Sequence, residues 1–183
     1  MNGSIIKKDD ALLVAIDFQE KLLPAIWERE KLEDSSAKLI KGCRVLGVPI
    51  LVTQQYTKGL GPTTATVAEA LGEYFPIEKQ TFSAMREPDF VKALKESGKN
   101  TVIVTGIEAH ICVQQTALDL IDAGYTVYGV VDCMSSRTKE NKEYGQLRMT
   151  QAGVIFTGLE SVLFDMLVDS NNENFKTISK IVK

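Results

Sequence analysis

The sequence predicts an α/β protein in which a doubly wound, Rossmann-like sheet of about six parallel strands lies between two layers of helices, giving three αβα layers. Short apolar segments rich in β-branched residues recur along the chain, and they lack the polar alternation of half-exposed strands. Segments with helical spacing separate them, so each strand is expected to cross over to a parallel neighbour. The 183 residues suffice for one domain, 1–183, with a substantial core.

The strand pattern is clearest in the first segment, Ala-Leu-Leu-Val-Ala-Ile-Asp, where only the last residue is polar. The later segments are shorter but equally apolar, and turn-forming or polar residues lie beside them. In chain order, the expected strands are residues 11–17, 50–54, 76–79, 101–105, 126–131 and 154–156.

The intervening segments show the apolar periodicity of helices that pack on a sheet. Gly-Val-Pro at 47–49 ends the first, and Gly-Pro at 61–62 opens the second. Gly98, Gly124 and Gly153 follow later ones, at the position where a left-handed residue often ends a helix. In chain order, the expected helices are residues 32–46, 63–74, 89–97, 111–123, 139–152, 161–168 and 175–182.

The composition limits the classes of partner and cofactor. A formal net charge of −3 gives no reason to expect nucleic acid or an anionic membrane as partner, and no apolar run is long enough to span a bilayer. The first residues lack the apolar core of a signal peptide. Three widely spaced cysteines argue against a disulfide framework and favour a reducing, cytoplasmic location. With a single histidine and no Cys-x-x-Cys pair, we expect no metal and no cofactor.

Polar residues lie at the predicted ends of several strands. Ligands of doubly wound sheets bind beyond the carboxyl ends of the strands, so residues there are candidates for a site. Side chains from distant parts of the chain converge at that edge. The candidates are Asp17 after the first strand, Gln54, Gln55 and Tyr56 after the second, Lys79 at the end of the third, Cys112 after the fourth and Asp132 after the fifth.

Cys112 is the candidate nucleophile. It is expected in the first turn of the helix that follows the fourth strand, where unpaired backbone N–H groups and the helix dipole favour the thiolate. Only the thiolate is a good nucleophile, so a cysteine enzyme would place its sulfur there. The alternative is that Cys112 is a small buried residue of the core, as most free cysteines are.

Asp17 and Lys79 could complete such a site. A carboxylate at the inner end of an apolar strand is partly desolvated and suited to act as a base, although Asp17 could instead cap the segment that follows. Lys79 could hold a negative centre or keep a thiolate ionised, or it could be an ordinary solvated lysine. Together, a nucleophile, a base and an electrostatic partner at three strand ends make a stronger case than any one alone.

These motifs give the chain a resemblance to the isochorismatase-like cysteine hydrolases. The matching segments are the strand into Asp17, Lys79-Gln-Thr-Phe-Ser, Gly106-Ile-Glu-Ala-His-Ile-Cys, Val130-Val-Asp-Cys-Met-Ser-Ser-Arg and Arg148-Met-Thr-Gln-Ala-Gly-Val. Gln54-Gln-Tyr-Thr-Lys-Gly-Leu-Gly and the C-terminal segment further resemble the subgroup of isochorismatase domain-containing proteins. The resemblance extends over nearly the whole chain.

The resemblance implies a catalytic triad of Asp17, Lys79 and Cys112. By analogy with the family, Asp17 would accept the thiol proton, Cys112 would attack a carbonyl or related carbon, and Lys79 would stabilise the charged pair. It also implies an oxyanion hole from the backbone N–H groups of Cys112 and Glu108, with a cis peptide bond between Ile107 and Glu108.

Departures from the family's patterns narrow the substrate class. Nicotinamidases of the family hold a metal with an aspartate and several histidines after the second strand, whereas this chain has Gln54-Gln-Tyr-Thr-Lys there. Some members that cleave isochorismate lack the cysteine, because vinyl-ether hydrolysis does not need it. The presence of Cys112 therefore favours hydrolysis of a C–N bond.

Five further residues are candidates for substrate binding. Gln55 and Tyr56 could line the pocket because of their position after the second strand. Phe18 and Phe82 follow triad segments and could form an apolar wall, or they could pack in the core. His110 could contact substrate, or it could be a turn residue that faces solvent.

The expected function is that of a metal-independent cysteine hydrolase that cleaves a small amide or carbamoyl compound. The alternatives are an isochorismatase-type vinyl-ether hydrolase, a binding protein without turnover, and a redox-sensing protein that uses Cys112. Members of the family commonly form dimers or larger homo-oligomers, so the same is expected here, with residues 175–182 as an exchange element.

Overall fold

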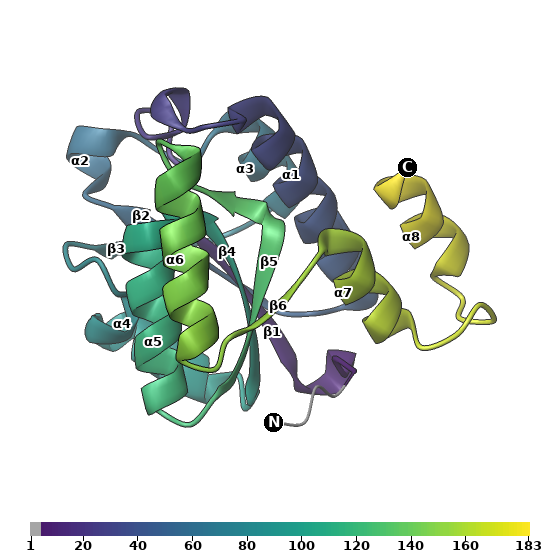
Figure 1. The fold of residues 1–183 in the computed structure, drawn as a ribbon. Coiled ribbons are helices and arrows are strands. Elements are labelled where there is room, and N and C mark those ends of the chain that lie inside the picture. The colour runs from purple at the N-terminus through teal and green to yellow at the C-terminus, as the bar shows by residue number, and fades with distance from the viewer. Residues whose placement is uncertain (1–4) are drawn as a thin grey trace.

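The computed structural model describes residues 5–183 and contains one sheet of six parallel strands in the order β3-β2-β1-β4-β5-β6 (Figure 1). This confirms the predicted doubly wound α/β fold. The strands are β1 (Ala11–Ile16), β2 (Ile50–Gln55), β3 (Ile77–Lys79), β4 (Thr101–Ile107), β5 (Thr126–Ser135) and β6 (Ile155–Thr157).

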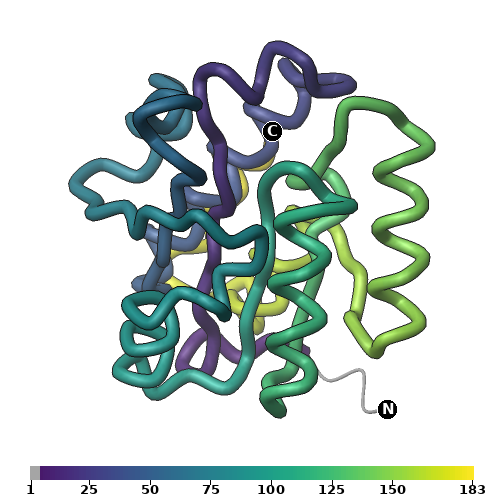
Figure 2. The backbone as a smooth tube through the Cα atoms, turned by 90° about the vertical axis from the view of Figure 1, so that its left-hand side faces the viewer, coloured from purple at the N-terminus to yellow at the C-terminus, as the bar shows by residue number. Residues whose placement is uncertain are grey.

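Helices cover both faces of the sheet. Alternate residues of β1 belong to two separate hydrophobic clusters, so α1, α3, α7 and α8 pack on one face and α4, α5 and α6 on the other. Figure 2 shows the second layer in front of the sheet and the yellow C-terminal segments behind it. The helices are α1 (Arg29–Leu46), α2 (Thr57–Leu60), α3 (Ala65–Leu71), α4 (Pro88–Glu96), α5 (Gln114–Asp122), α6 (Lys139–Gln151), α7 (Leu159–Leu167) and α8 (Phe175–Val182).

The strand order reverses between β1 and β4, and this switch point positions the site. All six residues of β1 are fully buried, as its unbroken apolar run predicts. Gly106 of β4 has a φ of 131°, and a Cβ there would collide with the backbone of Ile16. A glycine is therefore required for the two strand ends to approach each other.

One predicted segment differs from the structure in a way that matters for the candidate site. The strand expected at 126–131 continues to Ser135, because Gly106 and Ile107 pair with Met134 and Ser135 beyond an irregularity in the register. Asp132 therefore lies inside β5 instead of following it. Its Oδ1 accepts a hydrogen bond of 2.9 Å from the Leu159 N–H at the start of α7.

Other boundaries also shift. The helix expected at 63–74 covers only Ala65–Leu71. At its start, Thr63 Oγ1 accepts a hydrogen bond from Gln54 Nε2, and at its end Gly72 has a left-handed φ of 70°. The short helix α2 was not expected. The helix expected at 111–123 is a π-helical turn followed by α5, the helix expected at 32–46 begins at Arg29, and the strand expected at 101–105 reaches Ile107. The last helix has the predicted bounds, 175–182, and the remaining ends differ by at most two residues, as boundaries commonly do.

No helix formed by residues 5–183 combines the length and the apolar character that a membrane crossing requires.

Candidate active site

Asp17 and Lys79 form a buried ion pair at the carboxyl edge of the sheet. Asp17 directly follows β1, Lys79 is the last residue of β3, and neither exposes more than 1% of its surface. Lys79 Nζ lies 2.6 Å from Asp17 Oδ2. Asp17 has a φ of 54°, a left-handed conformation that aspartate tolerates better than most residues. Because water is excluded, each charge depends on the other for its stabilisation.

Neutral groups complete the hydrogen bonding of this pair. Thr53 Oγ1, on the neighbouring strand β2, donates to Asp17 Oδ1 at 2.7 Å. Lys79 Nζ donates to Gln55 Oε1 at 2.7 Å and to the Thr81 carbonyl at 3.3 Å. Both charged groups are thus held in a single orientation, as a preorganised site requires.

Gln55 is itself held by its surroundings. Its Nε2 donates to the Gln80 carbonyl at 2.9 Å, and its backbone N–H donates to Gln19 Oε1 at 2.7 Å. Gln19 Nε2 in turn donates to the carbonyls of Gln55 and Gly61 at 2.9 and 2.7 Å. The side chain of Gln55, a candidate for substrate binding, is therefore engaged with Lys79 and the backbone, which makes it a positioning residue.

Cys112 joins the ion pair from the other side of the switch point. It lies in the π-helical turn Ala109–Val113 that links β4 to α5, and its thiol hydrogen-bonds with Asp17 and Lys79. The structure therefore brings together the three residues expected to form a triad. Cys112 is 7% exposed, so it is buried but less completely than Asp17 and Lys79.

The resting state of Cys112 differs from the sequence-based expectation. Burial, followed by the negative charge of Asp17, raises the pKa of Cys112 to about 12, although Lys79 acts in the opposite direction. The expected preference for thiolate at a helix N-terminus is thus outweighed by desolvation and by the adjacent carboxylate. At neutral pH the sulfur is therefore protonated and lies against the Asp17 carboxylate.

The chain that leads into Cys112 contains a cis peptide bond. It joins Ile107 and Glu108, as the resemblance implied. The Glu108 carbonyl accepts from the N–H groups of Ile111 and Val113 at 3.0 and 3.2 Å. Its carboxylate Oε2 accepts from both the N–H and the Nε of Arg137, each at 3.0 Å. Hydrogen bonds from within the π-helical turn and from Arg137 in the loop after β5 thus hold Glu108 in place.

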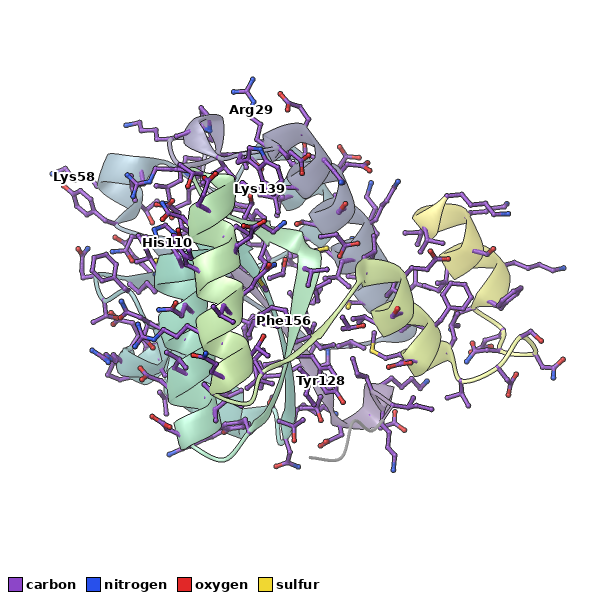
Figure 3. All side chains as sticks on the ribbon, viewed as in Figure 1. Arg29, Lys58, His110, Tyr128, Lys139 and Phe156 are labelled. Atoms are coloured by element: carbon purple, nitrogen blue, oxygen red, sulfur yellow. The ribbon has the colours of Figure 1, made fainter. Side chains whose placement is uncertain are left out.

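His110 lies within the π-helical turn Ala109–Val113, next to α6 and away from Tyr128 and Phe156 (Figure 3). Its Nδ1 is 2.9 Å from Ser136 Oγ and 4.0 Å from Glu108 Oε2. Burial lowers the pKa of His110, so the ring is neutral at neutral pH. The side chain therefore contacts the loop after β5 and is not a free turn residue in solvent.

The aromatic candidates fall into two groups. Tyr56 and Phe82 follow the strands that carry Gln55 and Lys79, and they are 46% and 54% exposed. Phe18 follows Asp17 but is only 2% exposed and belongs to the core cluster beneath α1. Tyr56 and Phe82 are thus open to a ligand, whereas Phe18 packs in the protein interior.

Two residues of the site were not identified from the sequence. Thr53 is a polar residue inside a predicted apolar strand, and that mismatch was a usable signal. Gln19 had no comparable signal, because its role depends on loops that only the fold brings together.

The other two thiols have different neighbours: Cys133 Sγ lies 3.9 Å from Asp132 Oδ1, and Cys43 is affected by burial alone. Cys43 and Cys133 are buried free thiols, and burial raises the pKa of Cys43 to about 12. Within residues 5–183, no three or more His, Cys, Asp or Glu side chains come together as a metal site would need.

The fold and this site define a class of Rossmann-like α/β proteins that carry a buried thiol beside an acid–base pair. The family model of the isochorismatase domain matches residues 11–161. Isochorismatase domain-containing protein 2 of Danio rerio is 37% identical over 182 residues, which cover 98% of this chain and 90% of that protein. The chain therefore belongs to the isochorismatase family, and it is similar to the domain-containing subgroup.

Further relatives extend this result. Isochorismatase domain-containing protein 1 of Danio rerio is 38% identical over 168 residues, and the match covers 91% of this chain but only 59% of that longer protein. A Caenorhabditis elegans structure described as MAR1 ribonuclease has a TM-score of 0.91 at 37% identity, covering 98% of this chain and 92% of that one.

The Escherichia coli YcaC gene product, described as an octameric hydrolase of unknown specificity, has a TM-score of 0.91 at 25% identity and covers 96% of this chain and 89% of its own. The chain thus has the fold of a hydrolase family.

Proposed function

We propose that this protein is a cysteine hydrolase that cleaves the C–N bond of a small amide or carbamoyl compound through a thioester intermediate. The observation that carries the proposal is the contact of the Cys112 thiol with the fully buried Asp17–Lys79 pair. A thiol held against a carboxylate can lose its proton at the moment of attack, which removes the need for a stable thiolate.

The first half of the reaction forms the acyl enzyme. Asp17 accepts the thiol proton while the sulfur of Cys112 bonds to the substrate carbonyl carbon. The developing oxyanion accepts hydrogen bonds from the N–H groups of Cys112 and Glu108. Asp17 then returns the proton to the nitrogen as the C–N bond breaks, and ammonia or an amine leaves.

The second half regenerates the enzyme. Asp17 takes a proton from water as the water oxygen attacks the thioester carbon, and the C–S bond breaks. The proton passes from Asp17 to the sulfur, and the acid product leaves. Throughout, Lys79 offsets the negative charge that moves between the carboxylate, the sulfur and the oxyanion. We assign contact with the substrate to Tyr56, Phe82 and His110.

The test is release of ammonia from a library of amides, ureides and carbamoyl compounds. We expect turnover by the wild type and loss of at least about a thousandfold in Cys112→Ala and Asp17→Asn, because each removes a member of one catalytic unit. Cys43→Ala is the control, since Cys43 is a still more deeply buried thiol without an acidic partner, and it should keep full activity. Mass spectrometry of acid-quenched enzyme should find the acyl adduct on Cys112.

Other outcomes would select the alternatives. Cleavage of isochorismate that survives Cys112→Ala would indicate vinyl-ether hydrolysis. Peroxide turnover that depends on Cys133 would indicate a redox role, and ligand protection of Cys112 without any turnover would indicate a binding protein. Because a relative is described as a ribonuclease, an RNA oligonucleotide belongs in the panel. The formal net charge of −3 makes RNA the less favoured substrate.

We further propose that the protein works as a homo-oligomer in a reducing, cytoplasmic compartment. The octameric state described for the Escherichia coli relative supports the first expectation. The three cysteines, all free thiols, support the second.

A further inference from the structure

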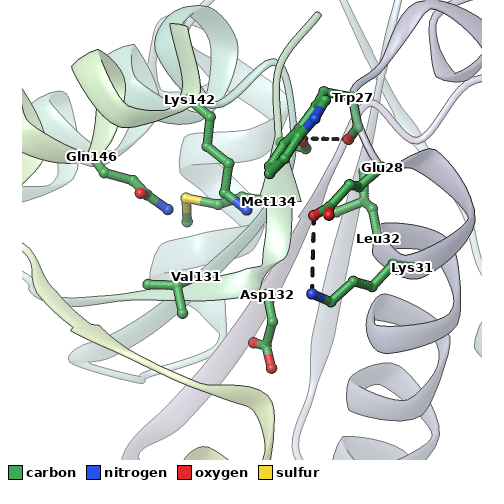
Figure 4. Close-up of a pocket in the computed structure, with 10 residues that line it drawn as sticks. Trp27, Glu28, Lys31, Leu32, Val131, Asp132, Met134, Lys142 and Gln146 are labelled. Carbon is green, nitrogen blue, oxygen red and sulfur yellow. Dashed lines mark hydrogen bonds and ion pairs between the residues drawn. The ribbon is translucent and has the colours of Figure 1, made fainter. Parts of the chain in front are cut away.

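A cavity of about 310 Å³ lies away from the triad, between the start of α1, the end of β5 and α6 (Figure 4). It exists because the edge strand β6 is much shorter than its neighbour β5. Strand β6 pairs only with Tyr128–Val130, so from Val131 onward no strand lies beside β5 on the side away from β4. None of Asp17, Lys79 and Cys112 lines this cavity.

Two hydrogen-bond donors on α6 reach into the cavity without an acceptor. Lys142 and Gln146 lie one helical turn apart, and Figure 4 shows their end groups pointing to the middle of the cavity, beside Met134. Among residues 5–183, Gln146 Nε2 is the one buried side-chain nitrogen or oxygen that has no hydrogen-bond partner. A buried amide nitrogen without an acceptor is unfavourable unless another molecule in the adjacent space supplies one.

Lys142 has an aromatic partner but no ionic one. Its Nζ lies 5.6 Å from the centre of the Trp27 ring, and within residues 5–183 no carboxylate lies within 4.0 Å of it. Burial lowers the pKa of Lys142, as expected for an ammonium group without a close counter-ion.

The two acids of the cavity are already engaged. Glu28 Oε2 lies 4.0 Å from Lys31 Nζ, and Asp132 Oδ1 accepts from the Leu159 N–H. With two lysines and two acids, the charges lining the cavity sum to zero, so a multiply charged anion would be repelled by as many groups as attract it. The other walls include the apolar side chains of Trp27, Leu32, Val131 and Met134.

From this arrangement we propose that the cavity is a second binding site, which takes a small monocarboxylate with an apolar body. The carboxylate accepts from Lys142 Nζ and Gln146 Nε2, and the apolar body lies against Trp27 and Met134. Charge-assisted hydrogen bonds supply the preference for an anion, and burial of the apolar body supplies the remaining affinity.

The chain contains a single tryptophan, so Trp27 fluorescence reports on this cavity. Phenylacetate is the probe, and phenylethanol is its neutral counterpart of similar shape. We expect a saturable change in Trp27 emission with phenylacetate and none with phenylethanol or inorganic phosphate. Loss of the charge-assisted bond in Lys142→Met should weaken binding about tenfold or more, and Gln146→Leu should weaken it by a smaller factor.

Two variants serve as controls. Lys139→Met removes a lysine from the same helix that pairs with Glu143 in solvent, and it should leave the affinity unchanged. Cys112→Ala should also bind phenylacetate normally, which separates this site from the catalytic one. The proposal is overturned if phenylacetate gives no saturable response, if phenylethanol or phosphate binds equally well, or if neither Lys142→Met nor Gln146→Leu weakens binding. Binding lost in Cys112→Ala would equally overturn it.

Discussion

Lys79 and Lys142 are both removed from bulk water, but their surroundings differ. Lys79 is fully buried and contacts Asp17, Gln55 and the Thr81 carbonyl. Lys142 is half-buried and lies over the Trp27 ring, and Glu28 and Asp132 act on its charge only from beyond ion-pair distance. The first lysine belongs to a closed network that is complete within the chain, whereas the second faces a cavity that also contains an unpaired amide.

The difference indicates two kinds of site. In the triad, the chain's own groups satisfy the charges, so the cluster is preorganised and a substrate has only to approach the sulfur. In the cavity between α1 and α6, donors are left without acceptors, so the most favourable state is one in which another molecule supplies the acceptor. This contrast predicts different responses to the same substitution.

The largest expected effect is on stability when each lysine is replaced by methionine. Lys79→Met leaves the Asp17 carboxylate buried without a counter-ion and should lower the free energy of unfolding by about 3–5 kcal/mol. Lys142→Met removes a cation that has no ionic partner, and it should change that free energy by less than about 1 kcal/mol. Urea unfolding near neutral pH measures both.

The double variant Asp17→Asn/Lys79→Met sharpens this comparison. Because it removes both charges, it should recover part of the stability that Lys79→Met loses. Equal stability of wild type and Lys79→Met would show that the pair is not buried in solution.

The second prediction concerns the reactivity of Cys112. With a pKa of about 12, its alkylation by iodoacetamide should accelerate about tenfold for each pH unit above neutrality, without a plateau near pH 8. Asp17→Asn removes the charge and the acceptor that hold the proton on the sulfur, so alkylation at about pH 8 should become about tenfold faster while turnover is lost. Peptide mapping of the alkylated protein measures the rate.

Cys43 is the internal reference, because its raised pKa is due to burial alone and should not respond to Asp17→Asn. An unchanged alkylation rate of Cys112 in Asp17→Asn would contradict the contact between its thiol and Asp17.

The raised pKa of Cys112 also has a consequence for stability. Between the ordinary pKa of 9.0 and about 12, folded Cys112 keeps a proton that the unfolded chain has lost. The free energy of unfolding should therefore fall as the pH rises through this range.

The smallest expected effect is that of Thr53→Val. This substitution removes the hydrogen bond to Asp17 Oδ1 without changing the shape of the side chain, and it should cost about 1–2 kcal/mol of stability. It should also lower kcat, because Asp17 would be less firmly oriented. Thr66→Val on the exposed face of α3 is the matched control and should change neither quantity. If Thr53→Val behaves like Thr66→Val, Thr53 does not position Asp17.

Much of the fold was predictable because its signals are local. The strand into Asp17 and the glycines after the helices lie where the apolar pattern placed them. The end of β5 was not predictable, because residues up to Ser135 become strand only through pairing with the distorted end of β4. The hydrogen bonds that join Gln55 to Lys79 and Asp132 to Leu159 were not predictable either, since each links groups that are distant in the chain.

The sequence by itself determined the parallel α/β class and predicted that Asp17, Lys79 and Cys112 meet at one edge of the sheet, because buried strands have an apolar run and ligand-binding residues of such folds follow the carboxyl ends of the strands. Only the tertiary structure decided that Cys112 rests as a thiol, that Thr53 and Gln55 position the ion pair, and that Lys142 and Gln146 share a cavity. The physical reason is that a pKa and the satisfaction of a hydrogen bond depend on burial and on neighbours from remote segments, which local pattern does not specify.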